Sequence, residues 1–137
     1  MFGIDVIIMC SYNVASIIIT LQGISLDGVW EKFKEYNEKN EVTAIVCKPG
    51  RTSKYRLIKY DISKYKYCYT YLTDIMFVDT LWRYIEVLPI RNKDSINVFT
   101  NQIFYTHAIQ RRMVQIHSSM IDHHGNGLLF LGPSGIG

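Results

Sequence analysis

The chain has 137 residues, 48% of them hydrophobic, and this composition excludes disorder as its dominant state. The formal net charge of +3 comes from Lys and Arg scattered among acids, so nucleic-acid binding has little electrostatic support. The three cysteines, Cys10, Cys47 and Cys68, form no CxxC pair, which favours reduced thiols in the cytoplasm over a disulfide framework or a zinc site.

The N-terminal region is rich in β-branched and apolar residues. Residues 4–10 and 14–20 are separated by the polar run 11–13, and this pattern predicts two buried strands. Asp5 interrupts the apolar region, no basic segment precedes it, and it is shorter than the roughly 20 apolar residues that a membrane span needs. We therefore expect no membrane association.

A change to helical spacing follows. Val29, Trp30, Phe33 and Tyr36 would share one face of a short helix that Ser25 or Asp27 caps. The simplest interpretation is that Trp30 and Phe33 dock this helix on a sheet.

The middle of the chain again predicts strands. Residues 42–47 form an apolar run that ends at the turn 48–51, and residues 75–78 and 82–88 continue the sheet until Pro89. Between residues 55 and 72 the chain is β-like, and alternation would place four tyrosine rings on one strand face, those of Tyr65, Tyr67, Tyr69 and Tyr71. Cross-strand aromatic packing explains this alternation more simply than base stacking does.

The longest predicted helix covers residues 96–113. Apolar residues recur three and four apart behind a cap at Asp94 or Ser95, and its proposed buried face contains Ile96, Phe99, Ile103, Thr106, Ile109 and Met113.

The last segment contains the candidate functional residues. Residues 114–122 have a strand pattern, residues 125–127 are a turn signal, and residues 128–131 are an apolar run suited to a buried strand. A glycine-rich run follows at once and consists of Gly132, Pro133, Ser134, Gly135, Ile136 and Gly137. A buried strand that enters such a run is typical of a P-loop, in which two glycines with four residues between them precede Lys and Ser or Thr.

The chemistry of phosphate binding explains this composition. Backbone N–H groups of a P-loop turn inward around a polyphosphate, which requires dihedral angles that glycine adopts easily and no Cβ in the way. The sequence reaches Gly137 without the Lys that contacts the β- and γ-phosphates or the hydroxyl that holds Mg²⁺.

Residues 116–137 resemble the start of the C-terminal domain of HPr kinase/phosphorylase, which shares its fold with phosphoenolpyruvate carboxykinase. The shared pattern is a His at the head of a strand, a glycine turn, an apolar strand and a Gly-x-Ser-Gly-x-Gly loop. Residues around Trp30 and Val42 are loosely similar to stand-alone kinases of this type that modify ribosomal peptide precursors.

The predicted elements and the resemblance together imply a fold class and a function. The predicted elements make an α+β chain, with a mixed β-rich module and two helices at residues 1–113, and the resemblance implies that residues 114–137 are the truncated first strands of a P-loop kinase domain. The parent protein would be an ATP- and Mg²⁺-dependent serine kinase acting on a protein or peptide hydroxyl. His117 would correspond to the active-site histidine, and Gly132 to Gly137 would bind the nucleotide. The chain departs from the family in lacking the Lys, the Ser or Thr and the downstream acids, so we expect the 137-residue chain to be inactive.

Other interpretations remain open. ATPases of ABC transporters share the Gly-Pro-Ser-Gly-x-Gly loop, although it usually lies much nearer their N-terminus. A non-catalytic module that binds a peptide at a sheet edge would make the glycine run a simple turn. His123 and His124 could bind a metal, but no third ligand is apparent and a solvated turn is favoured. An unfinished sheet would leave an apolar edge that invites oligomer formation.

Overall fold

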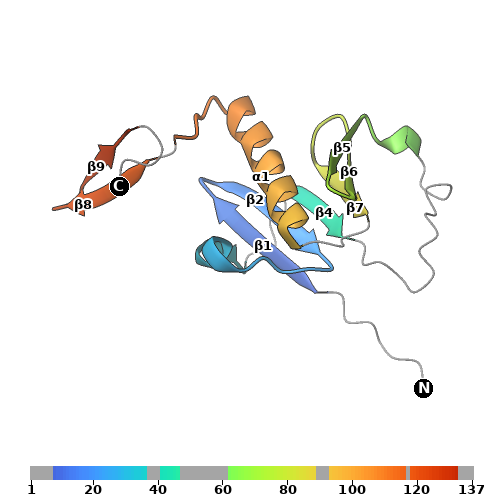
Figure 1. Cartoon of the computed structure of the whole chain (residues 1–137), viewed down its shortest axis with the longest axis horizontal. Coiled ribbons are helices and arrows are strands. Elements are labelled where there is room, and N and C mark those ends of the chain that lie inside the picture. The colour runs from blue at the N-terminus through green and yellow to red at the C-terminus, as the bar shows by residue number, and fades with distance from the viewer. Residues whose placement is uncertain (1–7, 37–40, 47–61, 89–92, 117, 133–137) are drawn as a thin grey trace, which may run out of the picture.

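The computed structural model places most of the predicted strands in one seven-stranded sheet, and an α-helix lies across one face of it (Figure 1). Two further strands form a separate hairpin near the C-terminus. This combination confirms the α+β class. The residues that the structure describes are 8–36, 41–46, 62–88, 93–116 and 118–132.

The large sheet is made of β1 (Met9–Val14), β2 (Ile17–Gln22), β3 (Lys34–Glu35), β4 (Val42–Val46), β5 (Tyr67–Tyr71), β6 (Asp74–Val78) and β7 (Tyr84–Leu88). Their order across the sheet is β3-β1-β2-β4-β7-β6-β5. The central strands β2, β4 and β7 run parallel, and every other pairing is antiparallel. The sheet therefore has a parallel centre between two antiparallel flanks.

The first two strands form a tight hairpin. Its turn lies at Ala15 and Ser16, whose φ angles of 50° and 65° suit a two-residue turn between twisted strands. The prediction of a break at residues 11–13 is wrong, because these residues lie inside β1. Polar side chains are tolerated there because the hydroxyls of Ser11 and Thr20 form a cross-strand hydrogen bond of 2.7 Å.

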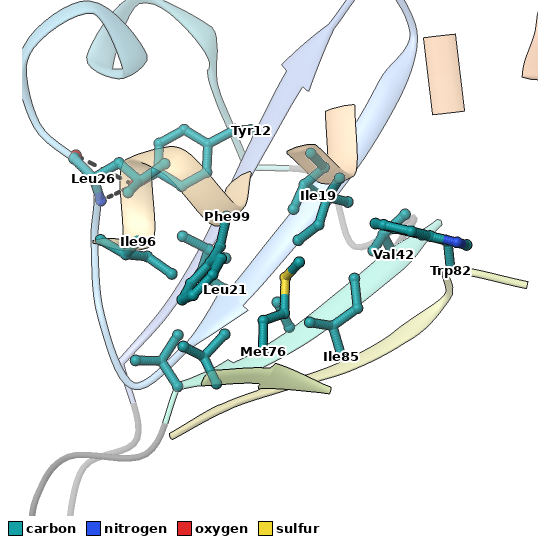
Figure 2. Close-up of a cluster of buried hydrophobic side chains, with 14 of the residues drawn as sticks. Tyr12, Ile19, Leu21, Leu26, Val42, Met76, Trp82, Ile85, Ile96 and Phe99 are labelled. Carbon is teal, nitrogen blue, oxygen red and sulfur yellow. Dashed lines mark hydrogen bonds between the residues drawn. The ribbon is translucent and has the colours of Figure 1, made fainter. Parts of the chain in front are cut away.

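The hydrophobic core lies between the helix and one face of the sheet (Figure 2). The registers Ile19↔Val42 and Leu21↔Ala44 place these four side chains on the same face, since side chains alternate along a strand. The fully or nearly fully buried members include Tyr12, Ile17, Ile19, Leu21, Val42, Ala44, Met76, Val78, Ile85, Val87, Ile96, Phe99 and Ile103.

Tyr12 is the polar member of this core. Its side chain has no exposed surface, and its hydroxyl accepts a hydrogen bond from the Leu26 N–H at 2.7 Å and donates one to the Leu26 carbonyl at 3.3 Å (Figure 2). The ring contacts Trp30 edge-on, with centroids 5.9 Å apart. Burial raises the pKa of Tyr12 to about 12, against the opposing effect of the Leu26 hydrogen bond.

The predicted amphipathic helix at residues 29–36 is shorter than expected. The structure has a 3₁₀ helix, η1 (Gly28–Phe33), in which only Trp30 is buried, while Val29 is 64% exposed. The predicted helical face is therefore wrong. Residues Lys34 and Glu35 leave the helix because they pair with β1 as β3.

Helix α1 (Lys93–Gln110) confirms the longest predicted helix. Asp94 and Ser95 lie inside its first turn rather than before it. The core face is filled toward the C-terminus by His107 and Ala108, whereas Ile109 is 72% exposed and was wrongly assigned to that face. Among the described residues, no helix combines the length and the apolar character needed to cross a membrane.

The tyrosine rings in β5 and just before it lie on two different faces of the sheet. Tyr67 and Tyr69 pack against Trp82, with centroids 6.1 Å and 5.3 Å apart. Tyr65 precedes β5, stacks on Phe77 and donates a hydrogen bond to a Glu86 carboxylate oxygen at 2.6 Å. The prediction that all four tyrosines share one face is therefore wrong for Tyr65.

Candidate functional site

The predicted strands before the glycine run form a regular hairpin. Strand β8 (Ser119–His123) pairs antiparallel with β9 (Asn126–Phe130). The turn lies at His124 and Gly125, both with positive φ, and the Gly125 N–H donates to the Asp122 carboxylate at 3.0 Å. The turn therefore lies slightly earlier than the predicted 125–127, because Asn126 and Gly127 belong to β9.

The apolar residues of this hairpin are not buried. Leu128 and Leu129 are each 49% exposed, Phe130 is 54% exposed and Leu131 is 64% exposed. On β8, Met120 and Ile121 are exposed as well. The predicted strand at 128–131 is therefore confirmed as a strand, but the prediction that it is buried is wrong within the part of the chain that the structure describes.

Gly132 lies two residues after the end of β9, with Leu131 between them. It is exposed, and a Cβ added there would meet no atom of the described residues within 4 Å. No described residue therefore crowds the start of the predicted loop. The other predicted nucleotide-binding residues, Pro133 to Gly137, and the predicted catalytic His117 lie outside the described residues.

His123, at the end of β8, and His124, in the turn, have adjacent side chains. The rings of His123 and His124 are 4.5 Å apart and roughly perpendicular, and both residues are exposed. Within the described ranges, no group of three or more His, Cys, Asp or Glu residues is arranged to hold a metal ion.

A second feature is a polar pocket that the sequence did not indicate. The cavity has a volume of about 620 Å³ and is lined by Glu41, Thr80, Leu81, Arg83, His107, Gln110 and Arg111. These residues come from the end of α1, the β6–β7 turn and the residue before β4. Since they are scattered along the chain, the only local signals were the basic pair after α1 and a histidine on its apolar face.

The two sides of this pocket are joined by hydrogen bonds. His107 is buried, and its Nε2 donates to the Trp82 carbonyl at 2.8 Å, which fixes a proton on that nitrogen. Arg111 donates to the Ser16 carbonyl at 2.8 Å and forms an ion pair with Glu41. The end of α1 is thereby tied to the start of β2, to the segment before β4 and to the β6–β7 turn.

No family model, curated protein or solved structure matches this chain.

Proposed function

We propose that the chain forms the N-terminal part of an ATP-dependent kinase of the HPr kinase type, which transfers the γ-phosphoryl group of ATP to a hydroxyl of a protein or peptide. The observation that carries the proposal is the position of Gly132 two residues after the end of β9 at Phe130. The hairpin before it has the strand, turn and strand order expected before a P-loop. The glycine spacing in Gly132 to Gly137 agrees with it.

The exposure of the hairpin also supports this function. A strand that leads into a P-loop is usually buried on both faces in a largely parallel sheet, and such strands are continuous apolar runs. Residues 128–131 form such a run, yet within the described part of the chain their side chains remain 49–64% exposed. Further layers of a kinase domain would cover these side chains.

The described residues bear on the two expected cofactors, ATP and Mg²⁺, in different ways. No described residue crowds Gly132, so a phosphate group of ATP would have room to approach its backbone. ATP supplies the phosphoryl group, the backbone N–H groups of Gly132 to Gly137 would bind its phosphates, and His117 would hold or move a proton near them. The described residues offer no cluster for Mg²⁺, which would be held elsewhere in the parent protein.

The first test is the reading frame after the codon for Gly137. The proposal expects Lys followed by Ser or Thr, and a chain extended by the native downstream sequence should transfer labelled phosphate from ATP to peptides that contain Ser. A stop codon directly after Gly137 would contradict a kinase function for this gene.

A matched pair of variants tests the role of the histidine in the extended chain. His117→Ala should lower the rate of transfer by about 10²-fold or more, which is the usual contribution of a general acid or base. His123→Ala removes an exposed histidine at the end of β8 and should leave the rate unchanged. Equal rates for both variants would remove His117 from the mechanism.

The remaining outcomes separate the alternatives. The 137-residue chain itself should not transfer phosphate, and measurable transfer by it would refute the inactivity that we expect. ATP hydrolysis without a phosphorylated peptide would favour an ABC-type ATPase. Complete indifference of the extended chain to ATP would favour a peptide-binding module, for which β5 offers an outer edge that no described strand pairs with.

A further inference from the structure

The polar pocket lies where the three parallel strands of the large sheet begin. Glu41 immediately precedes β4, Arg83 immediately precedes β7, and Arg111 contacts Ser16, which immediately precedes β2. The lining residues include none from the hairpin β8–β9 or from Gly132. The pocket is therefore a feature separate from the predicted nucleotide loop.

One wall of the pocket is a turn held by the Asp79 carboxylate. This group accepts hydrogen bonds from the N–H groups of Arg83 at 2.7 Å and Tyr84 at 2.9 Å, with a weaker contact of 3.4 Å to Leu81. Inside the turn, Trp82 adopts a left-handed φ of 59°, which is costly for a large side chain. Such strain persists only where the surroundings fix the backbone, so Arg83 leaves this turn from a fixed position.

The opposite wall is equally constrained. His107 reaches across to the Trp82 carbonyl, and Arg111 is braced by Glu41 and by the Ser16 carbonyl. These three contacts hold the end of α1 against the segments that precede the strands. Both walls of the cavity are therefore fixed by contacts within the protein.

The charges of the pocket favour an anion. Its lining residues include two arginines, Arg83 and Arg111, and one glutamate, Glu41. Arg111 is paired with Glu41, whereas Arg83 forms no ion pair with any residue in the described ranges. Thr80 and Gln110 add a hydroxyl and an amide as neutral hydrogen-bonding groups.

We propose that this pocket binds a small-molecule oxyanion, with the Arg83 guanidinium as its direct ligand. A guanidinium presents its N–H donors in a planar fork that matches two oxygens of one phosphate or carboxylate group. A cavity of about 620 Å³ lies within the usual range for small-molecule sites, and its polar lining suits a hydroxylated ligand such as a sugar phosphate or a hydroxy acid. Arg111 acts as a positioning residue that shapes the wall.

The experiment is a set of calorimetric titrations of the 137-residue protein at constant ionic strength. Glucose 6-phosphate and inorganic phosphate probe a phosphate group, and citrate probes carboxylates. Saturable binding of the phosphate compounds or of citrate is expected, and the tighter class identifies the group that the pocket prefers. Absence of saturable binding by all three probes would overturn the proposal.

Variants locate the binding. Arg83→Gln should weaken the Kd of the bound probe by about tenfold or more, as expected for loss of a charge-assisted contact, and Arg83→Lys should give an intermediate value. Arg112→Gln is the matched control, because it removes the same charge from an exposed residue that does not line the pocket. Glu41→Gln should tighten binding, because it removes the carboxylate.

The readout distinguishes a site from general attraction to a basic protein. Equal weakening by Arg83→Gln and Arg112→Gln would show a non-specific charge effect and overturn the proposal. The Arg83 side chain has no ion-pair partner to lose among the described residues, so the urea midpoint of Arg83→Gln should match that of the unaltered protein. A large shift in that midpoint would contradict its assignment as a ligand-binding side chain.

Discussion

Removal of one hydroxyl from the core tests how Tyr12 stabilises the sheet. In Tyr12→Phe the ring can keep its edge contact with Trp30, but the N–H and carbonyl of Leu26, which is only 3% exposed, lose their hydrogen-bond partner. Leaving buried polar groups unpaired costs about 1–3 kcal/mol. We expect the free energy of unfolding near neutral pH to fall by this amount in urea titrations followed by far-UV circular dichroism.

The difference in stability between the unaltered protein and Tyr12→Phe should shrink at high pH. The pKa of Tyr12 is raised to about 12 in the folded chain, while an unfolded tyrosine has a pKa of about 10. A raised folded pKa means that the stabilisation is fully present below about pH 10 and is lost as the pH rises through about 12. The two-unit difference corresponds to about 3 kcal/mol, so the advantage of the unaltered protein over Tyr12→Phe should largely disappear over this interval.

A surface tyrosine supplies the control. Tyr84 is 67% exposed, so Tyr84→Phe should differ little from the unaltered protein at any pH. Equal stability of Tyr12→Phe and the unaltered protein at neutral pH would contradict a stabilising role of the hydroxyl. A difference in stability that stays constant up to about pH 12 would contradict the raised pKa of Tyr12 as its source of pH dependence.

Three further substitutions test other features. Gly23→Ala should lower the free energy of unfolding by more than about 2 kcal/mol, because φ is 98° and an added Cβ would overlap the Val46 carbonyl. Gly28→Ala is the control and should cost only about 1 kcal/mol, because φ is 66° and no atom of the described residues lies within 4 Å of the added carbon. Similar values for the two variants in urea titrations would contradict this. Asp79→Ala should cost about 1–2 kcal/mol in the same titrations, because the carboxylate accepts several backbone N–H groups, and an unchanged midpoint would show that water replaces it fully. Leu129→Lys should leave that midpoint unchanged but reduce self-association in analytical ultracentrifugation, because the side chain is half exposed on the hairpin; equal association would place the contact elsewhere.

Much of the fold follows from local periodicity. The helix near residue 100 and the strands at 42–46 and 84–88 were predictable because their apolar spacing matches a single burial pattern. The failures have a tertiary cause. Residues 11–13 look like a turn but remain in β1 because cross-strand partners satisfy their polar groups, and β3 forms after Phe33 because β1 offers a free edge.

The candidate sites differ in how far the sequence reveals them. The glycine run is contiguous, so its spacing alone indicates phosphate binding. Arg83 and Arg111 line the same pocket only because β4 and β7 are parallel neighbours and the end of α1 lies near the first residues of these strands. No local sequence pattern predicts this arrangement, because it depends on the order of the strands in the sheet.

The position of β4 has a consequence for the order of folding. Its neighbours belong to separate units that close short loops: the β1–β2 hairpin on one side and the β5–β6–β7 meander on the other. The pairings Ile19↔Val42 and Thr43↔Tyr84 instead join distant segments, and closing longer loops costs more entropy. We expect the two local units to form early and to share a core only when β4 enters between them. Substitutions in the β1–β2 turn should therefore slow folding more than equally destabilising substitutions in β4, which should mainly speed unfolding.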